Sequence, residues 1–63
     1  MKVGDRVRCV DARDQTKYYN VGAEGVVIDV DTDVCVKFDR GEYRTSGDNT
    51  SWFGEFDQFE VIE

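Results

Sequence analysis

Residues 21–41 constrain the fold more than any other part of the chain. The segment reads VGAEGVVIDV, then an acidic Asp-Thr-Asp tip, then VCVKFDRG. Two glycines three residues apart open a run of β-branched side chains, and the second run alternates apolar with polar positions. β-branched residues favour strands, and glycine permits a bend or bulge in a strand. The segment therefore predicts a strongly bent β-hairpin with strands over residues 24–31 and 34–38.

Three more short strands are expected around this hairpin. Residues 5–10 alternate charged and apolar side chains, the pattern of a half-buried strand, and residues 42–45 and 59–62 follow turns or loops. Residues 11–20 are polar and form a long first loop. One turn of 3₁₀ helix is expected near residues 55–58, before the last strand.

These elements predict an all-β fold in which residues 1–63 form a single domain. A chain of 63 residues has a small core, so most functional groups must lie on the surface. Closure into a five-stranded barrel would remove the exposed strand edges of a flat sheet. We expect Phe38, Phe56 and Phe59 in the core of this barrel.

Short motifs along the chain resemble an SH3-like barrel. They are the opening VGDRVR from Val3, the Gly22-x-x-Gly25 pair before two valines, and the Asp-x-Gly turn at Gly41. The pattern resembles the KOW-type barrels of ribosomal and transcription-elongation proteins. It also resembles mind-bomb-type domains, in which Tyr and Gly follow that turn, as Tyr43 and Gly47 do here. The resemblance implies an SH3-like architecture, but the basic surface of RNA-binding KOW barrels and the Ala-Leu-Tyr-Asp-Tyr signature of signalling SH3 domains are both absent.

Charge and composition argue against several classes of function. Eight basic against fourteen acidic residues give a net charge of −6, which disfavours phosphate binding and suits either plain solubility or a basic partner. The chain has no histidine, so the usual general base and zinc ligand are missing. We therefore expect no enzyme, no metal site and no cofactor.

One spacing looks metal-like, at Asp29-x-Asp31-x-Asp33. An EF-hand calcium loop would continue with Gly and Glu where this chain has Val34 and Arg40, so a solvated hairpin tip is the preferred interpretation. Two cysteines outside a Cys-x-x-Cys arrangement are typical of a reduced, cytoplasmic protein. No apolar run approaches the length that a membrane span needs. We expect a cytoplasmic monomer without a membrane contact.

The aromatic residues are the main indication of a binding site. We predict a partner-binding shelf between the first loop and the loop around Asp48, since aromatic side chains dominate binding hot spots. The residues predicted for it are Tyr18, Tyr19, Tyr43, Trp52, Asp48 and Glu55. The alternative is that Tyr43 and Trp52 only cover one end of the barrel.

A basic stripe supports a second hypothesis, that the protein is a KOW-like accessory of transcription or translation. Its members are Arg6, Arg8, Arg13 and Lys17, which could contact a nucleic-acid backbone next to the tyrosines. Cross-strand ion pairing with the acidic excess is the preferred alternative for these side chains. The sequence therefore favours a non-catalytic module that binds a protein partner, for example an adaptor or regulator of a larger machine.

Overall fold

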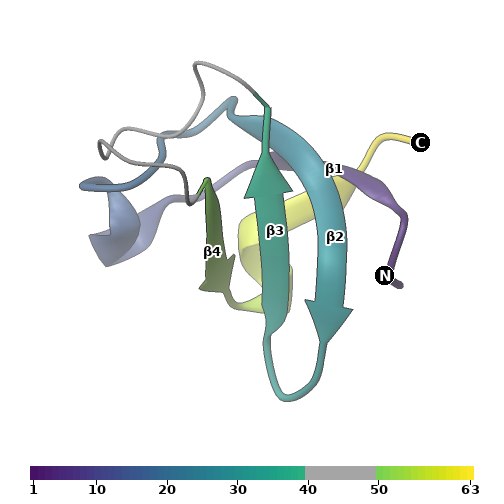
Figure 1. The fold of residues 1–63 in the computed structure, drawn as a ribbon. Coiled ribbons are helices and arrows are strands. Elements are labelled where there is room, and N and C mark those ends of the chain that lie inside the picture. Colours follow the sequence, from purple (N-terminus) through teal and green to yellow (C-terminus); the bar gives the residue numbers. More distant parts are fainter. Residues whose placement is uncertain (40–49) are drawn as a thin grey trace.

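The computed structural model describes residues 1–39 and 50–63 and has one sheet of five antiparallel strands (Figure 1). The strands are β1 (Arg6–Cys9), β2 (Glu24–Val30), β3 (Val34–Phe38), β4 (Ser51–Gly54) and β5 (Phe59–Val61). Two 3₁₀ turns accompany them, η1 (Arg13–Gln15) in the first loop and η2 (Phe56–Gln58) before β5. The strand order is β4-β3-β2-β1-β5. Within the described residues β4 and β5 do not pair, so the sheet is not closed.

The predicted all-β class is confirmed. Strands lie within one or two residues of the ranges predicted at 5–10, 24–31, 34–38 and 59–62, and the 3₁₀ turn before the last strand is present. The strand predicted at residues 42–45 lies outside the described residues. The fourth strand of the structure, β4, has no counterpart among the predicted strands, because its Ser-Trp-Phe-Gly sequence is too short to show a period.

The central hairpin of β2 and β3 has one irregularity in its register and one close approach of its strands. A register shift lies between Val27, which pairs with Val36, and Asp29, which pairs with Cys35. Ile28 lies at this irregularity and is 45% exposed, whereas Val27 is buried. At Gly25 the two strands approach so closely that a Cβ atom would meet the backbone of Lys37 and Phe38. The glycine predicted to allow a bend is therefore needed for a close approach of strands.

The core lies on the concave side of the sheet, and one tyrosine of the first loop belongs to it. The buried apolar residues are Val7, Cys9, Ala12, Tyr19, Ala23, Val27, Val34, Val36, Phe38 and Phe59. The ring of Tyr19 has no exposed surface and stacks on Phe38 at a centroid distance of 4.6 Å, with Phe59 at 5.6 Å. The first loop is thus part of the folded core.

Two predictions about the aromatic residues are wrong. Tyr19 was expected on an exposed shelf, but it fills the space between Phe38 and Phe59 that a sheet of short valine side chains leaves open. Phe56 was expected in the core, but it is 41% exposed. It begins η2, and it is Gln58, two residues later in that turn, that is buried.

Candidate functional site

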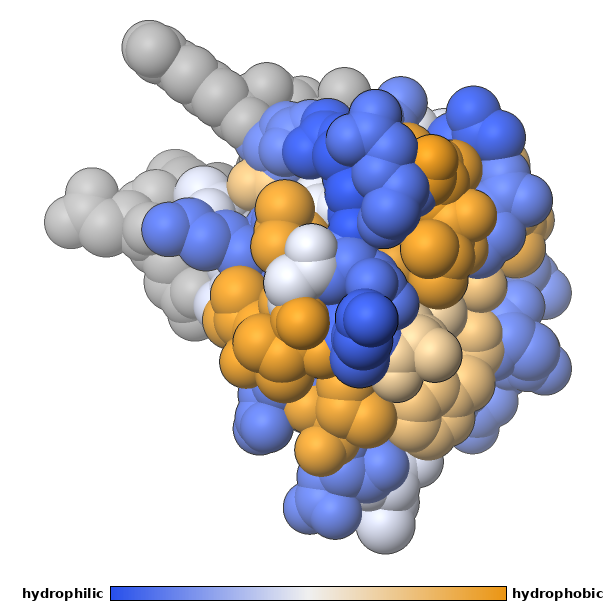
Figure 2. Space-filling model, turned by 90° about the vertical axis from the view of Figure 1, so that its right-hand side faces the viewer, coloured by the Kyte–Doolittle hydropathy of each residue, from blue (hydrophilic) through white to orange (hydrophobic). Residues whose placement is uncertain are grey.

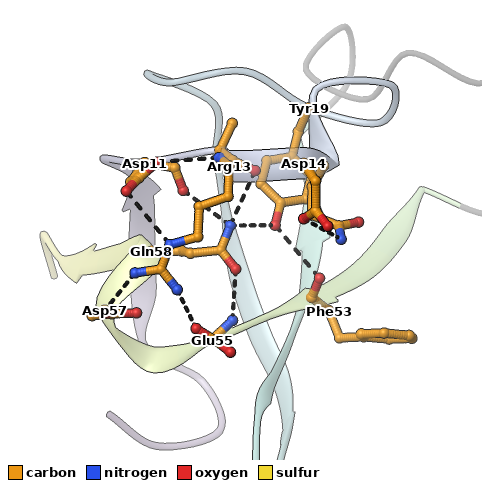
Figure 3. Close-up of polar contacts among 10 residues, drawn as sticks. Asp11, Arg13, Asp14, Tyr19, Phe53, Glu55, Asp57 and Gln58 are labelled. Atoms are coloured by element: carbon orange, nitrogen blue, oxygen red, sulfur yellow. Dashed lines mark hydrogen bonds and ion pairs between the residues drawn. The ribbon is translucent and has the colours of Figure 1, made fainter.

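The first loop, residues 10–23, is attached to η2 through the side chain of Gln58 (Figure 3). The Gln58 Nε2 amide donates to the backbone oxygens of Asp11 and Ala12 at 3.0 and 3.2 Å, and it lies 3.4 Å from the Tyr19 hydroxyl. Its Oε1 accepts from the backbone N–H of Glu55 at 2.8 Å. This buried amide therefore joins the loop to the turn between β4 and β5.

Ion pairs on the outside of the same junction come from Arg13. Its guanidinium pairs with Asp11, Asp57 at 2.6 Å, and Glu55, as Figure 3 shows. These carboxylates raise the pKa of Arg13, and the hydrogen bond from Arg13 lowers the pKa of Asp57. Arg13 has a φ of 51°, a left-handed conformation that costs an L-residue some strain. The ion pairs hold the loop in place although its backbone is strained there.

Three aromatic rings stack across the first loop and β4, and we call them the aromatic stack: Tyr18, Trp52 and Phe53. Tyr18 and Trp52 have centroids 4.1 Å apart, and Trp52 and Phe53 have centroids 5.1 Å apart with nearly parallel planes. The Trp52 Nε1–H donates to Gln15 Oε1 at 2.6 Å. Tyr18 and Trp52 are half-buried, whereas Phe53 is 50% exposed. The stack therefore ends in a ring that is open to solvent.

A cavity of about 490 Å³ lies beside this ring. It is lined by Arg13, Asp14, Gln15, Asp33, Phe53, Gly54, Glu55 and Gln58. The lining comes from the first loop, the tip of the β2–β3 hairpin, the end of β4 and η2. Three of these residues are carboxylates, one on each of three separate elements. Chemically the cavity offers an aromatic face and negative charge, which together suit a cation.

The predicted site residues divide into three groups. Tyr18 and Trp52 come together as expected, and Glu55 lines the adjacent cavity. Tyr19 is buried in the core. Tyr43 and Asp48 lie outside the described residues. Tyr18 and Trp52 also pack against the core, as the alternative of an aromatic cover predicts, so a binding role for Trp52 stays a prediction.

Six residues of the site were missed by the sequence analysis: Asp14, Gln15, Asp33, Phe53, Gly54 and Gln58. Phe53 follows Trp52 directly, and strand alternation alone would place the two side chains on opposite faces, so no pattern in the sequence predicts that their rings stack. Asp33 was interpreted only as part of a solvated tip. Its place in the cavity depends on how the hairpin meets the first loop, which no local pattern shows.

The arginines of the predicted basic stripe are ion-paired. Arg6 pairs with Asp39 and with Glu24, the latter at 3.3 Å. Arg8 pairs with Glu60, its direct cross-strand neighbour on β5. The hydrogen bonds that Arg6 donates to Asp39 and that Arg8 donates to Glu60 raise the pKa of both arginines. The cross-strand ion pairing that the sequence analysis preferred is therefore present for Arg6 and Arg8.

The remaining member of the basic stripe, Lys17, is exposed and has no ion pair within residues 1–39 and 50–63.

Cys9 and Cys35 are free thiols, and burial raises the pKa of each. In the described part of the chain no group of three or more His, Cys, Asp or Glu side chains is arranged to hold a metal ion.

Within residues 1–39 and 50–63, no helix has the length and apolarity needed to cross a membrane.

A second apolar area lies on the face that carries both chain termini. Figure 2 shows orange and tan side chains on this face, interrupted by blue ones. Exposed apolar residues of the N-terminal segment, β2 and β5 include Val3, Ile28 and Val61. None of them lines the cavity beside Phe53. The two apolar surfaces are therefore made of different residues.

Comparison of the chain with protein-family models, with curated proteins and with solved structures gave no match. The interpretation of the site therefore rests on its own geometry. That geometry combines an exposed aromatic ring, a cavity lined by carboxylates from three segments of the chain, and a loop attached to η2 by Gln58. Such an arrangement can bind a ligand by contact and charge.

Proposed function

We propose that this protein is a small non-catalytic module, folded as an SH3-like barrel, that binds a basic, extended segment of a protein partner. The partner segment would lie along the aromatic stack and place a Lys or Arg side chain in the adjoining cavity. The single observation that carries the proposal is the exposed Phe53 ring beside the carboxylates of Asp14, Asp33 and Glu55.

The barrel part of the proposal is supported by the connectivity of the sheet. The first strand lies between β2 and the last strand, and β4 leads through one 3₁₀ turn into β5. A curved sheet with this order brings its two edge strands toward each other, because a covalent turn of a few residues joins them. The resemblance of the Gly-x-x-Gly and Asp-x-Gly motifs to SH3-like barrels agrees with this arrangement.

The chemistry of the cavity favours a cationic side chain. Asp14 and Asp33 have no ion pair within the described residues, whereas Glu55 already pairs with Arg13. A cation next to Phe53 would gain both a ring contact and the attraction of carboxylates. The net charge of −6 also attracts a basic partner at longer range. Asp14 and Asp33 are therefore the carboxylates that we expect to contact the ligand.

The nucleic-acid hypothesis has less support from the contacts. Nucleic-acid binding depends on arginine and lysine side chains that pair with backbone phosphates and displace the counterions of those phosphates. Arg6, Arg8 and Arg13 each pair with at least one carboxylate of the same chain. Binding of a phosphate would have to break these pairs, so we prefer a protein partner.

The experiment is a binding screen against an array of nonapeptides. Each peptide contains prolines that favour an extended backbone, and matched members carry Lys, Arg or Ser at one central position. We expect micromolar binding of the Lys and Arg members and at least tenfold weaker binding of the Ser members. Fluorescence polarisation of the best peptide then gives affinities for the variants.

Phe53→Ser and Asp33→Asn should each weaken binding of that peptide about tenfold, because they remove the ring and one carboxylate. Ile28→Ser is the matched control, since Ile28 is similarly exposed on a strand but does not line the cavity. Equal affinity of all three variants, or no binding by any basic peptide, would contradict the proposal. Micromolar binding of a mixed-sequence RNA that weakens steeply with salt would favour the nucleic-acid hypothesis instead.

A further inference from the structure

Gln58 is the one buried polar residue among the described residues, and every polar atom of its side chain has a partner. Two sets of contacts connect Gln58 to the aromatic stack, although Gln58 makes no hydrogen bond to any of the three rings. The first concerns the backbone oxygen of Ala12, and the second concerns the Tyr19 hydroxyl. Both sets of contacts reach Trp52 through residues of the first loop.

The Ala12 oxygen accepts two hydrogen bonds, one from Gln58 Nε2 at 3.2 Å and one from the backbone N–H of Gln15 at 2.9 Å. Gln15 in turn accepts from the Trp52 indole through Oε1 and from the Tyr18 backbone N–H through its own backbone oxygen. The position of Ala12 thus determines where Gln15 meets Trp52. Gln15, whose side chain binds the indole, lies only three positions after Ala12 in the sequence.

The Tyr19 hydroxyl lies 3.4 Å from Gln58 Nε2 and 3.5 Å from the Phe53 backbone oxygen. A Cβ atom on Gly54 would come within 2.7 Å of this hydroxyl and 2.8 Å of Gln58 Oε1, so the three groups are tightly packed. Tyr18 directly precedes Tyr19 and stacks on Trp52. The amide of Gln58 therefore also limits how far the Tyr18–Tyr19 pair can move relative to β4.

We propose that Gln58 is a positioning residue, which sets the first loop at the place where Tyr18 and Gln15 contact Trp52. This inference rests on the proposed function for its biological meaning, because the stack that Gln58 aligns is the predicted peptide surface. An amide is required by the contacts: its N–H groups hold two loop carbonyls while its oxygen accepts from Glu55. A carboxylate lacks the donors, and an apolar side chain lacks both donors and acceptor.

The indole N–H of Trp52 is a direct reporter of this arrangement, since the chain has one tryptophan. In ¹⁵N–¹H spectra of the full chain, its signal and its hydrogen-exchange rate report whether Gln15 is in place. Gln58→Glu keeps the acceptor for Glu55 and removes the donors to the loop, whereas Gln58→Met removes both. Gln15→Ala gives the signal of an indole without its partner.

We expect the indole signal of Gln58→Glu and Gln58→Met to move toward that of Gln15→Ala, with exchange about tenfold faster than in the wild type. The indole signal and exchange rate of the double variant Gln58→Met/Gln15→Ala should differ little from those of Gln15→Ala alone, because both substitutions act on the same contact. The best basic peptide from the array should bind the Gln58 variants about tenfold more weakly.

Val7→Ala is the matched control, because Val7 is buried on β1 and makes none of these contacts. Its urea midpoint should fall while its indole signal stays that of the wild type. An unchanged indole signal in both Gln58 variants would overturn the proposal, and so would an equal change in Val7→Ala. If the indole responds as expected but no basic peptide binds the wild type, the positioning role stands and the proposed function fails.

Discussion

Strands β1–β3 and the first loop are attached to the rest of the domain by different kinds of contact. The strands contact one another through backbone pairing and small apolar side chains such as Val7, Val27 and Val36. The loop contacts β4 and η2 through the buried Gln58 amide, its two tyrosines, Gln15 and the ion pairs of Arg13. The strands are therefore held mainly by the sheet, whereas the place of the first loop depends on a few side-chain contacts.

Two glycines illustrate this difference, because both lie at close approaches. A Cβ at Gly25 would meet the backbone of β3, which cannot move without breaking the sheet. A Cβ at Gly54 would meet the ends of three side chains, Tyr19, Gln58 and Phe59, which can shift. The same substitution at these positions therefore tests whether the two regions differ in rigidity.

The largest effect is expected for Gly25→Ala. The added methyl group would overlap the β3 backbone and Val36, and overlap with a backbone cannot be relieved by a change of rotamer. We expect a loss of about 3 kcal/mol or more in the free energy of unfolding, enough to unfold much of a domain this small. Circular dichroism and urea titration measure it. A folded variant with the wild-type urea midpoint would show that β2 and β3 are less closely packed than described.

Gly54→Ala should have a smaller effect on stability, about 1–2 kcal/mol, and a clear effect on the loop. Displacement of the Tyr19 hydroxyl and Gln58 would shift the Trp52 indole signal while the strand amides keep their positions. NMR spectra of the variant check both statements together. Changes spread evenly over the strands would contradict the distinction between the two regions.

Tyr19→Phe removes only a hydroxyl and should cost about 1 kcal/mol at pH 7, because Gln58 keeps its two backbone acceptors. Burial raises the pKa of Tyr19 to about 12, above the value of about 10 for an unfolded chain. The folded state thus holds this proton more tightly, and the hydroxyl contributes stability below pH 10 that is lost between about pH 10 and 12. Urea midpoints of the wild type should fall more steeply over this range than those of Tyr19→Phe. Parallel slopes would contradict the burial of Tyr19.

The smallest effect is expected for Asp57→Asn, which removes an exposed partner of Arg13. The hydrogen bond from Arg13 lowers the pKa of Asp57, so this carboxylate contributes stability above its unfolded pKa of about 4 that is lost as the pH falls through the folded value. We expect a nearly unchanged urea midpoint at pH 7, since exposed ion pairs contribute little. Below pH 4 the midpoint of the wild type should fall faster than that of the variant. The same pH dependence in both proteins would show that this ion pair does not hold the loop.

The sequence predicts the strand region better than the loop region, for a physical reason. Alternating and β-branched residues determine β1, β2 and β3 locally, because each strand exposes one face to the core. The place of Tyr19 depends instead on the gap between Phe38 and Phe59, which forms only when distant strands meet. A polar loop containing two adjacent tyrosines gives no local sign of which ring turns inward.

The candidate site was predictable in part for the same reason. Trp52 and Tyr18 stand out by residue type, and aromatic residues in a small chain are limited in where they can be buried. The contributions of Asp33 and Gln58 could not be predicted, because an aspartate at a hairpin tip and a glutamine before a strand are ordinary residues at those places. Their roles come from residues distant in the sequence; Gln58, for example, contacts Ala12 across 46 positions.

We propose that binding takes place where the first loop meets β4 and the hairpin tip. The most direct test is a titration of the ¹⁵N-labelled protein with the best basic nonapeptide, followed through the amide signals and the Trp52 indole. We predict shifts concentrated at Asp14, Asp33, Phe53 and Trp52, with none at the Arg8–Glu60 pair on β1 and β5. Shifts concentrated at that pair, with an unmoved Trp52 indole, would contradict the claim.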